Sequence, residues 1–342
     1  MKYDIRQTPR TPDYRNLLKV LERNQPDRPT LFEFFLNDDL YAFLNGKEIL
    51  EYRTDNEYQY YRMMANAVAG YDYIALMGTN MVITREKGHR KDTVSLNDGD
   101  FVTDRKAFDA YPWPDPDDYD YSRLDYVSER LVPGMRMVTY GPGGILENAI
   151  GITGYDNMCY MDYDDPVLLG DIFEKVTDIL VGYYKNVSYR EDVCAVISND
   201  DWGFNTQTML SYVNMEKYVF PGHRRIVNTI HQAGKPAILH SCGNMREVMG
   251  DIINTLGYDA KHSYEDNILP VEKAYAELEG KIAVLGGIDL DFVCRSRPEE
   301  VHERSRDMLC RGKTGYALGS GNSIPSYVPI ENYMAMISAV YE

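Results

Sequence analysis

The sequence predicts an α/β protein built as a (β/α)8 barrel, and two observations carry this prediction. Eight short runs rich in β-branched and aromatic residues follow one another along the chain, at 30–36, 71–77, 135–140, 193–198, 236–241, 259–263, 282–285 and 315–318. Helical spacing of apolar residues lies between most of them, at 166–187, 212–233, 245–256, 270–278 and 298–309. Strands that alternate with helices form a parallel sheet, and eight such units fit a closed barrel better than an open doubly wound sheet.

Two segments are additional to the eight strand–helix units of a minimal barrel. Residues 1–28 are expected to form an N-terminal helical arm, and residues 29–342 a single barrel. Residues 80–134 separate the second and third predicted strands, and Pro112–Asp118 is too rich in Pro and Asp for a helix interior. We expect this insertion to lie over the barrel mouth, with a surface excursion that has no function as the alternative.

Composition and charge exclude several classes of partner and location for this protein. The 342 residues are 44% hydrophobic and 26% charged, as in ordinary globular proteins. The formal net charge of −17 repels phosphate backbones and anionic lipid, so we expect neither a nucleic-acid partner nor a membrane partner. No apolar run approaches the roughly 18 residues of a membrane span. Five cysteines, an odd number, indicate free thiols in a reducing compartment, so a cytoplasmic location is expected.

In a barrel of this kind, function lies at the carboxyl ends of the strands. The sharpest pattern there is His240-Ser241-Cys242, because residues two apart on a strand point to the same face. Imidazole and thiolate are ligands that zinc prefers, and a catalytic zinc keeps one position open. The alternative is a small core cysteine beside a hydrogen-bonded histidine.

Carboxylates supply the other candidates. Glu33 lies in an apolar run, where a carboxyl must be paired, protonated or bound to metal, so it is either an acid/base or metal-binding group or the partner of a barrel cation. Asp200 and Asp201 are adjacent at a strand end, so one could cap a helix while the other faces the pocket. His262 is either a ligand or a packed core histidine.

Longer stretches carry a family resemblance over residues 30–342. They are SNDDWG at 198–203, YVFP at 218–221, GKPAILHSCGN at 234–244, GGID at 286–289, RPEEV at 297–301 and GYALGSGNSIP at 315–325. Together they resemble the uroporphyrinogen decarboxylase superfamily, which includes zinc methyltransferases that exchange methyl groups with corrinoid proteins.

The resemblance favours the methyltransferase branch. True decarboxylases carry an Arg-Gln-Ala-Gly-Arg-Tyr run, and here EFFLNDD stands at 33–39, with acids in place of arginines. The methyltransferases use His-x-Cys and a later Cys as zinc ligands. His240 and Cys242 match the pair, but Asn322 occupies the later position, which is a His in the decarboxylases, so the third ligand stays open.

These observations predict a metal-dependent methyltransferase that acts with a corrinoid protein. Zinc is the expected metal, and cobalamin would be carried by the partner. The catalytic residues expected are Glu33, Asp201, His240 and Cys242, and those expected to contact a small-molecule substrate are Tyr140, Asp200, Trp202, His262 and Asn322. A decarboxylase with a porphyrinogen or other carboxylate substrate, a non-catalytic ligand-binding barrel, and assembly as a homodimer are left open.

Overall fold

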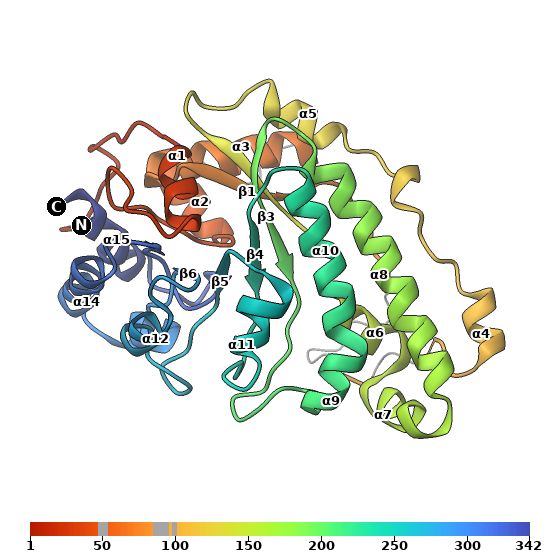
Figure 1. Ribbon diagram of the computed structural model, residues 1–342. Helices are drawn as coiled ribbons and strands as arrows, with labels where there is room; N and C mark the ends of the chain where they lie inside the picture. Colours follow the sequence, from red (N-terminus) through yellow and green to blue (C-terminus); the bar gives the residue numbers. More distant parts are fainter. Residues whose placement is uncertain (47–53, 85–95, 98–100) are drawn as a thin grey trace.

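A parallel sheet forms the centre of the protein in the computed structural model, which describes residues 1–46, 54–84, 96–97 and 101–342 (Figure 1). Its seven strands follow the order of the sequence, β1-β2-β3-β4-β5-β6-β7, and each pairs in parallel with the next. They are β1 (Tyr73–Met77), β2 (Arg136–Tyr140), β3 (Val193–Asn199), β4 (Ala237–His240), β5 (Ala260–His262), β6 (Ala283–Leu285) and β7 (Tyr316–Ala317). The parallel α/β architecture is thus confirmed.

The first predicted strand, 30–36, does not form a regular strand, so the expectation of eight strands is corrected to seven. Only Leu31 bridges to Leu318, beyond β7, with Phe32 N donating to Leu318 O over 2.8 Å. The reason lies in Tyr73 of β1. Its hydroxyl accepts from Glu33 N at 2.8 Å and donates to Glu33 O at 2.6 Å, so a side chain takes the backbone groups that a ladder with β1 would use.

Helices connect the strands and cover the sheet, with α8 and α10 side by side over it in Figure 1. Among the described residues the longer helices are α2 (Asp38–Asn45), α3 (Asp55–Ala69), α6 (Ile145–Thr153), α7 (Tyr155–Asp164), α8 (Pro166–Ser188), α10 (Phe220–Gln232), α12 (Val271–Leu278), α14 (Pro298–Arg311) and α15 (Ile330–Ser338). Shorter ones are α1 (Arg15–Leu21), α4 (Arg105–Ala110), α5 (Ser122–Ser128), α9 (Tyr212–Asn214), α11 (Met249–Asp251) and α13 (Leu290–Arg295). None of the described helices is long and apolar enough to cross a bilayer.

Local sequence explains the ends of the helices. Pro166 starts α8 in its first turn, and the Asp165 side chain accepts from Leu168 N at 3.0 Å. Helix α10 continues a π-helical turn, Met215–Val219, so the predicted helical stretch 212–233 is a chain of three short elements. Val193 to Ile197 of β3 are all nearly inaccessible to solvent, as expected for a central strand of a parallel sheet that is covered on both faces.

The described part of the insertion runs along the outside of α8. Arg105 of α4 pairs with Asp171, and Asn186 donates to Asp117 over 2.8 Å. A side chain added at Gly182 of α8 would lie 2.7 Å from Pro116. Residues 85–95 and 98–100 lie outside the described residues, so a position of the insertion over the mouth stays a prediction.

Candidate functional site

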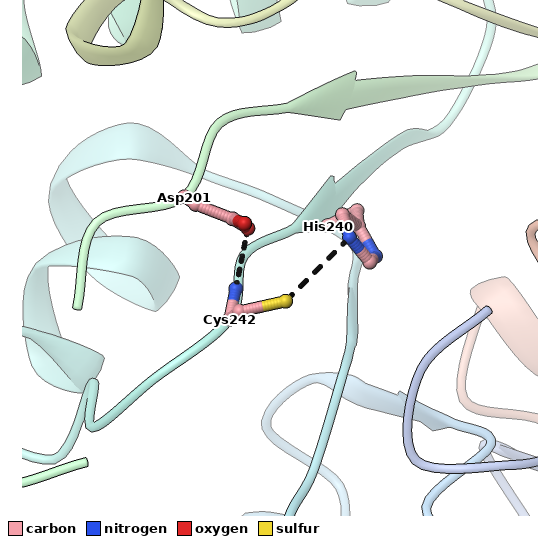
Figure 2. Close-up of side chains that lie close together, drawn as sticks. All are labelled: Asp201, His240 and Cys242. Atoms are coloured by element: carbon pink, nitrogen blue, oxygen red, sulfur yellow. Dashed lines mark hydrogen bonds between the residues drawn. The ribbon is translucent and has the colours of Figure 1, made fainter. Parts of the chain in front are cut away.

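Three donor side chains meet where β3 and β4 end. The backbone register pairs Asn199 of β3 with His240 of β4, so the residues that follow each strand lie side by side. Asp201, His240 and Cys242 each offer one ligand atom, and these atoms all lie within 4.8 Å of one another. Figure 2 shows Asp201 leaving the end of one strand while His240 and Cys242 come from its neighbour.

Hydrogen bonds fix the two sides of this cluster. Cys242 N donates to Asp201 Oδ1 over 2.8 Å, and Cys242 Sγ lies 3.9 Å from His240 Nε2 (Figure 2). The turn after Cys242 requires glycine, because Gly243 has a φ of +89° and an added Cβ would lie 2.2 Å from the Gly203 carbonyl oxygen. Gly203 and Gly243 therefore let the β3 and β4 loops touch and bring Asp201 to Cys242.

His240 is oriented by a second histidine. Its Nδ1 lies 2.7 Å from Nδ1 of His262, and its ring centroid lies 4.8 Å from that of Phe34. Burial lowers the pKa of His240 to about 4 and that of His262 well below its ordinary value, so both rings are neutral near pH 7. With Nδ1 of His240 engaged, its Nε2 is the atom that faces Cys242.

Cys242 sulfur accepts two hydrogen bonds, from Asn322 Nδ2 at 3.2 Å and from Ser263 Oγ at 3.5 Å. Burial, with Asp201 beside it, raises the pKa of the thiol to about 12, and the two donors act in the opposite direction. Ser263 reaches the sulfur from a left-handed backbone conformation, with a φ of +82°, which is rare for a residue with a side chain.

This donor set suits a metal ion. Imidazole nitrogen, thiolate sulfur and carboxylate oxygen are the three ligand types that zinc takes in proteins, and three protein ligands leave the fourth position of a catalytic site open. A metal-binding histidine usually has its other ring nitrogen hydrogen-bonded, as His240 has through His262. The residues at this site therefore fit zinc, and Asp201 offers a third donor atom where the sequence left the third ligand open.

Comparisons with known proteins agree with this fold. A sequence profile described as Uroporphyrinogen decarboxylase (URO-D) matches residues 114–342. The chain belongs to this family. It is 26% identical over 190 residues to the uroporphyrinogen decarboxylase of Geobacter sp. (strain M21), over 53% of this chain and 51% of that protein. It is 24% identical over 212 residues to that of Ruthia magnifica subsp. Calyptogena magnifica, over 58% and 55%.

The chain thus spans about half the length of the curated uroporphyrinogen decarboxylases that it matches. A solved structure described as a methyltransferase from Methanosarcina mazei shares the fold, with a TM-score of 0.70 and 15% identity over 95% of this chain and 97% of that one. The superfamily resemblance seen in the sequence is therefore confirmed, with a methyltransferase among the structural neighbours.

The other predicted site residues fall into two groups. Asp200 is fully buried: its oxygens accept from Leu146 N and Glu147 N at 2.9 Å, which caps α6, and from His223 Nε2 at 2.8 Å. Trp202 is also fully buried and packs its ring on His223. Both side chains are buried in this uroporphyrinogen decarboxylase family member, and direct substrate contact by Asp200 or Trp202 stays a prediction.

Tyr140, His262 and Asn322 lie around the three-residue cluster. Tyr140 is half-buried and packs edge-on against Phe34, which in turn contacts His240. Asn322 and His262 contact Cys242 and His240 directly. Glu33 does not join the cluster, because its carboxyl is bonded to Ser320.

Sequence reasoning missed two contributors, Ser263 and Lys261. The Lys261 ammonium is buried and donates to the carbonyl oxygens of Ser241, His262 and Ser263 at 2.5–3.3 Å, which ties together the loops that carry Cys242 and Ser263. Burial lowers the pKa of Lys261 to about 8. A lysine within the predicted strand 259–263 was the only sequence signal for this role, and nothing in the sequence indicated the backbone conformation of Ser263.

Proposed function

We propose that this protein is a metal-dependent methyltransferase that moves a methyl group between a small substrate and a corrinoid protein. The observation that carries the proposal is the convergence of Asp201, His240 and Cys242, whose donor atoms all lie within 4.8 Å. We propose zinc as the metal and a (β/α)8 barrel as the scaffold, with residues 30–36 in the place of its first strand. The corrinoid partner and a homodimer are parts of the same proposal.

Each of the three residues has a separate task in this mechanism. Zinc held there would lower the pKa of a bound thiol or hydroxyl, or polarise the heteroatom that carries the methyl group. His240 presents Nε2, because its Nδ1 is engaged with His262. Cys242 supplies sulfur, and Asn322 and Ser263 donate hydrogen bonds that stabilise its negative charge. Asp201 supplies a carboxylate oxygen and holds the Cys242 backbone in place.

A decarboxylase is the second candidate, since the family description and the curated relatives carry that name. Acidic residues argue against a polyanionic substrate: Asp201 is in the cluster itself, and Asp38 and Asp39 are exposed at the start of α2. Three other acidic residues that follow strands have partners within the protein: Asp200 caps α6, Asp266 pairs with Arg304, and Asp289 caps α13. A non-catalytic ligand-binding barrel is the candidate outside enzymes.

Metal content and methyl transfer test these alternatives. We expect about one zinc per chain in untagged protein, and loss of that zinc in His240→Ala, Cys242→Ser and Asp201→Asn variants. The matched control is Cys194→Ser, a buried cysteine of β3 with no place in the cluster. The loaded protein should then exchange methyl groups with cob(I)alamin when methoxy-aromatics, thiols and methylamines are screened. Carbon dioxide release from porphyrinogens without methyl transfer would contradict the proposal.

A further inference from the structure

The carboxyl group of Glu33 has an unusual set of partners. Its side chain is buried, with 3% of the residue exposed, and both oxygens face one residue, Ser320. Oε1 accepts from Ser320 N at 2.6 Å, and Oε2 lies 2.8 Å from Ser320 Oγ. Within the described parts of the chain, no Lys, Arg or His forms an ion pair or hydrogen bond with this carboxyl. A carboxylate buried in this way without a cation is costly.

The hydrogen bonds of Ser320 show whether the Glu33 carboxyl carries a proton. Ser320 Oγ also makes a short hydrogen bond to the carbonyl oxygen of Asn322. That carbonyl has no proton to give, so the single hydroxyl proton of Ser320 belongs to the Asn322 bond. The 2.8 Å contact between Ser320 Oγ and Glu33 Oε2 then needs a proton from the carboxyl, because two bare acceptors would repel each other.

The groups around Glu33 also favour the protonated form of its carboxyl. The phenols of Tyr71, Tyr73, Tyr316 and Tyr333 lie around Glu33, and His262 packs against the neighbouring residue, Phe32. All of them are neutral near pH 7, because burial lowers the pKa of His262 and raises those of the tyrosines. Burial also raises the pKa of Glu33 to about 8, although the hydrogen bonds with Ser320 act in the opposite direction.

Ser320 belongs to the loop 319–323, which carries Asn322 to the sulfur of Cys242. Gly319 lies so close to residues 30–36 that an added Cβ would overlap the Phe32 carbonyl oxygen. Gly321 N donates to Ile288 O over 2.7 Å on the other side of the loop. Asn322 Nδ2 then donates to Cys242 Sγ over 3.2 Å. Glu33 is therefore joined to Cys242 through two residues of one loop.

We propose that Glu33 is a positioning residue that works as a neutral carboxylic acid: it holds Ser320, and through this loop it holds the Asn322 amide on the Cys242 sulfur. This inference rests on the proposed function only where it treats Cys242 as a metal ligand. It differs from the acid/base or metal-binding role that the sequence suggested for Glu33, since the carboxyl faces Ser320 and not the three-residue cluster.

Infrared spectroscopy of metal-free protein tests the protonation state. The difference between the wild-type protein and Glu33→Gln at neutral pH should contain the carbonyl band of a protonated carboxylic acid. Ser320→Ala should shift that band, because it removes one hydrogen-bond partner of the acid and leaves Glu33 in place. A difference spectrum that contains only carboxylate bands would overturn the proposal.

Zinc affinity, measured by competition with a chelator, tests the positioning role. Glu33→Gln should bind zinc as the wild-type protein does, because the amide of Gln can donate to Ser320 Oγ as the acid does. Glu33→Ala and Ser320→Ala should bind about 10-fold more weakly or worse, as is usual when an outer partner of a metal ligand is removed. Glu33→Gln as weak as Glu33→Ala, or Glu33→Ala and Ser320→Ala as tight as wild type, would overturn the proposal. A wild-type protein that binds no zinc would contradict the proposed function instead, and the infrared measurement would still decide the state of Glu33.

Discussion

His240 and His262 are directly opposite each other in the parallel pair of β4 and β5, and their Nδ1 atoms lie 2.7 Å apart. One neutral imidazole donates and the other accepts, so this contact couples the tautomer of one ring to that of the other. If His240 donates, its Nε2 keeps a free lone pair on the side of Cys242 and Asp201. The pairing of two strands thus prepares one ring for metal binding.

Removing His262 should weaken zinc binding without removing a ligand. We expect His262→Ala to lower zinc affinity about 10- to 100-fold, because the ring of His240 loses the partner that orients it. Chelator competition and the visible spectrum of the cobalt-substituted protein would measure the change. His231→Ala, which removes a histidine bonded to Asp259 and outside the cluster, is the matched control and should bind zinc normally. Equal affinity in His262→Ala and wild type would contradict the orienting role.

Zinc binding near pH 7 should release about one proton per chain, because Cys242 starts as a thiol and must bind as a thiolate. Burial raises the pKa of Cys242 to about 12 and lowers that of His240 to about 4, so the histidine contributes no proton. Calorimetric titrations in buffers of different ionisation enthalpy count the protons released. Cys242→Ser should release none, and proton release independent of Cys242 would exclude this ligand.

Ser263 should show opposite effects of its backbone and its hydroxyl. Ser263→Gly relieves the left-handed backbone, whereas Ser263→Ala keeps it, and both remove the hydroxyl that contacts Cys242. We expect Ser263→Gly to be more stable than Ser263→Ala by about 1 kcal/mol, measured by chemical denaturation. Both variants should bind zinc more weakly than wild type. Weaker binding in only one of them would assign the effect to the backbone instead of the hydroxyl.

Most of the fold follows from the sequence because most of its strands are short apolar runs bounded by Gly, Pro and polar residues, and each predicted run from 71–77 onward overlaps an observed strand. Residues 30–36 look the same in sequence, but the Tyr73 hydroxyl occupies the backbone groups of Glu33 and prevents a regular ladder. The Tyr73 side chain of β1 thus determines whether residues 30–36 form a strand, and the spacing of residues along the chain does not reveal this contact.

Some residues of the site are likewise predictable from the sequence, and others depend on tertiary contacts. His240 and Cys242 are recognisable because residues two apart on a strand share a face, although β4 ends at His240 and Cys242 lies in the loop that follows. The roles of Asp200 and Asp201 depend on which carboxylate turns toward α6 and which toward Cys242, and adjacent residues give no sign of it. Ser263 reaches the sulfur through a backbone angle, and Asn322 through a loop held by Ser320, so both depend on tertiary contacts.

Glu33 should make the stability of the protein fall as pH rises. Its pKa is about 8 in the folded protein and near 4.5 in the unfolded chain, so the unfolded chain loses this proton first. The stability that Glu33 contributes is complete below about pH 4.5 and is lost progressively up to about pH 8, by at most about 5 kcal/mol. Glu33→Gln cannot ionise, so its stability should not fall with pH for this reason.

The melting temperatures of wild type and Glu33→Gln, measured from pH 5 to pH 9, test this linkage. The melting temperature of Glu33→Gln should rise relative to that of the wild type as pH rises. The difference between the two melting temperatures should level off above about pH 8. Glu303→Gln, the same change at an exposed carboxylate of α14, is the control and should show no such rise, because the Glu303 side chain is exposed to water. A difference between wild type and Glu33→Gln that is independent of pH, or that shrinks as pH rises, would mean that Glu33 is ionised in the folded protein.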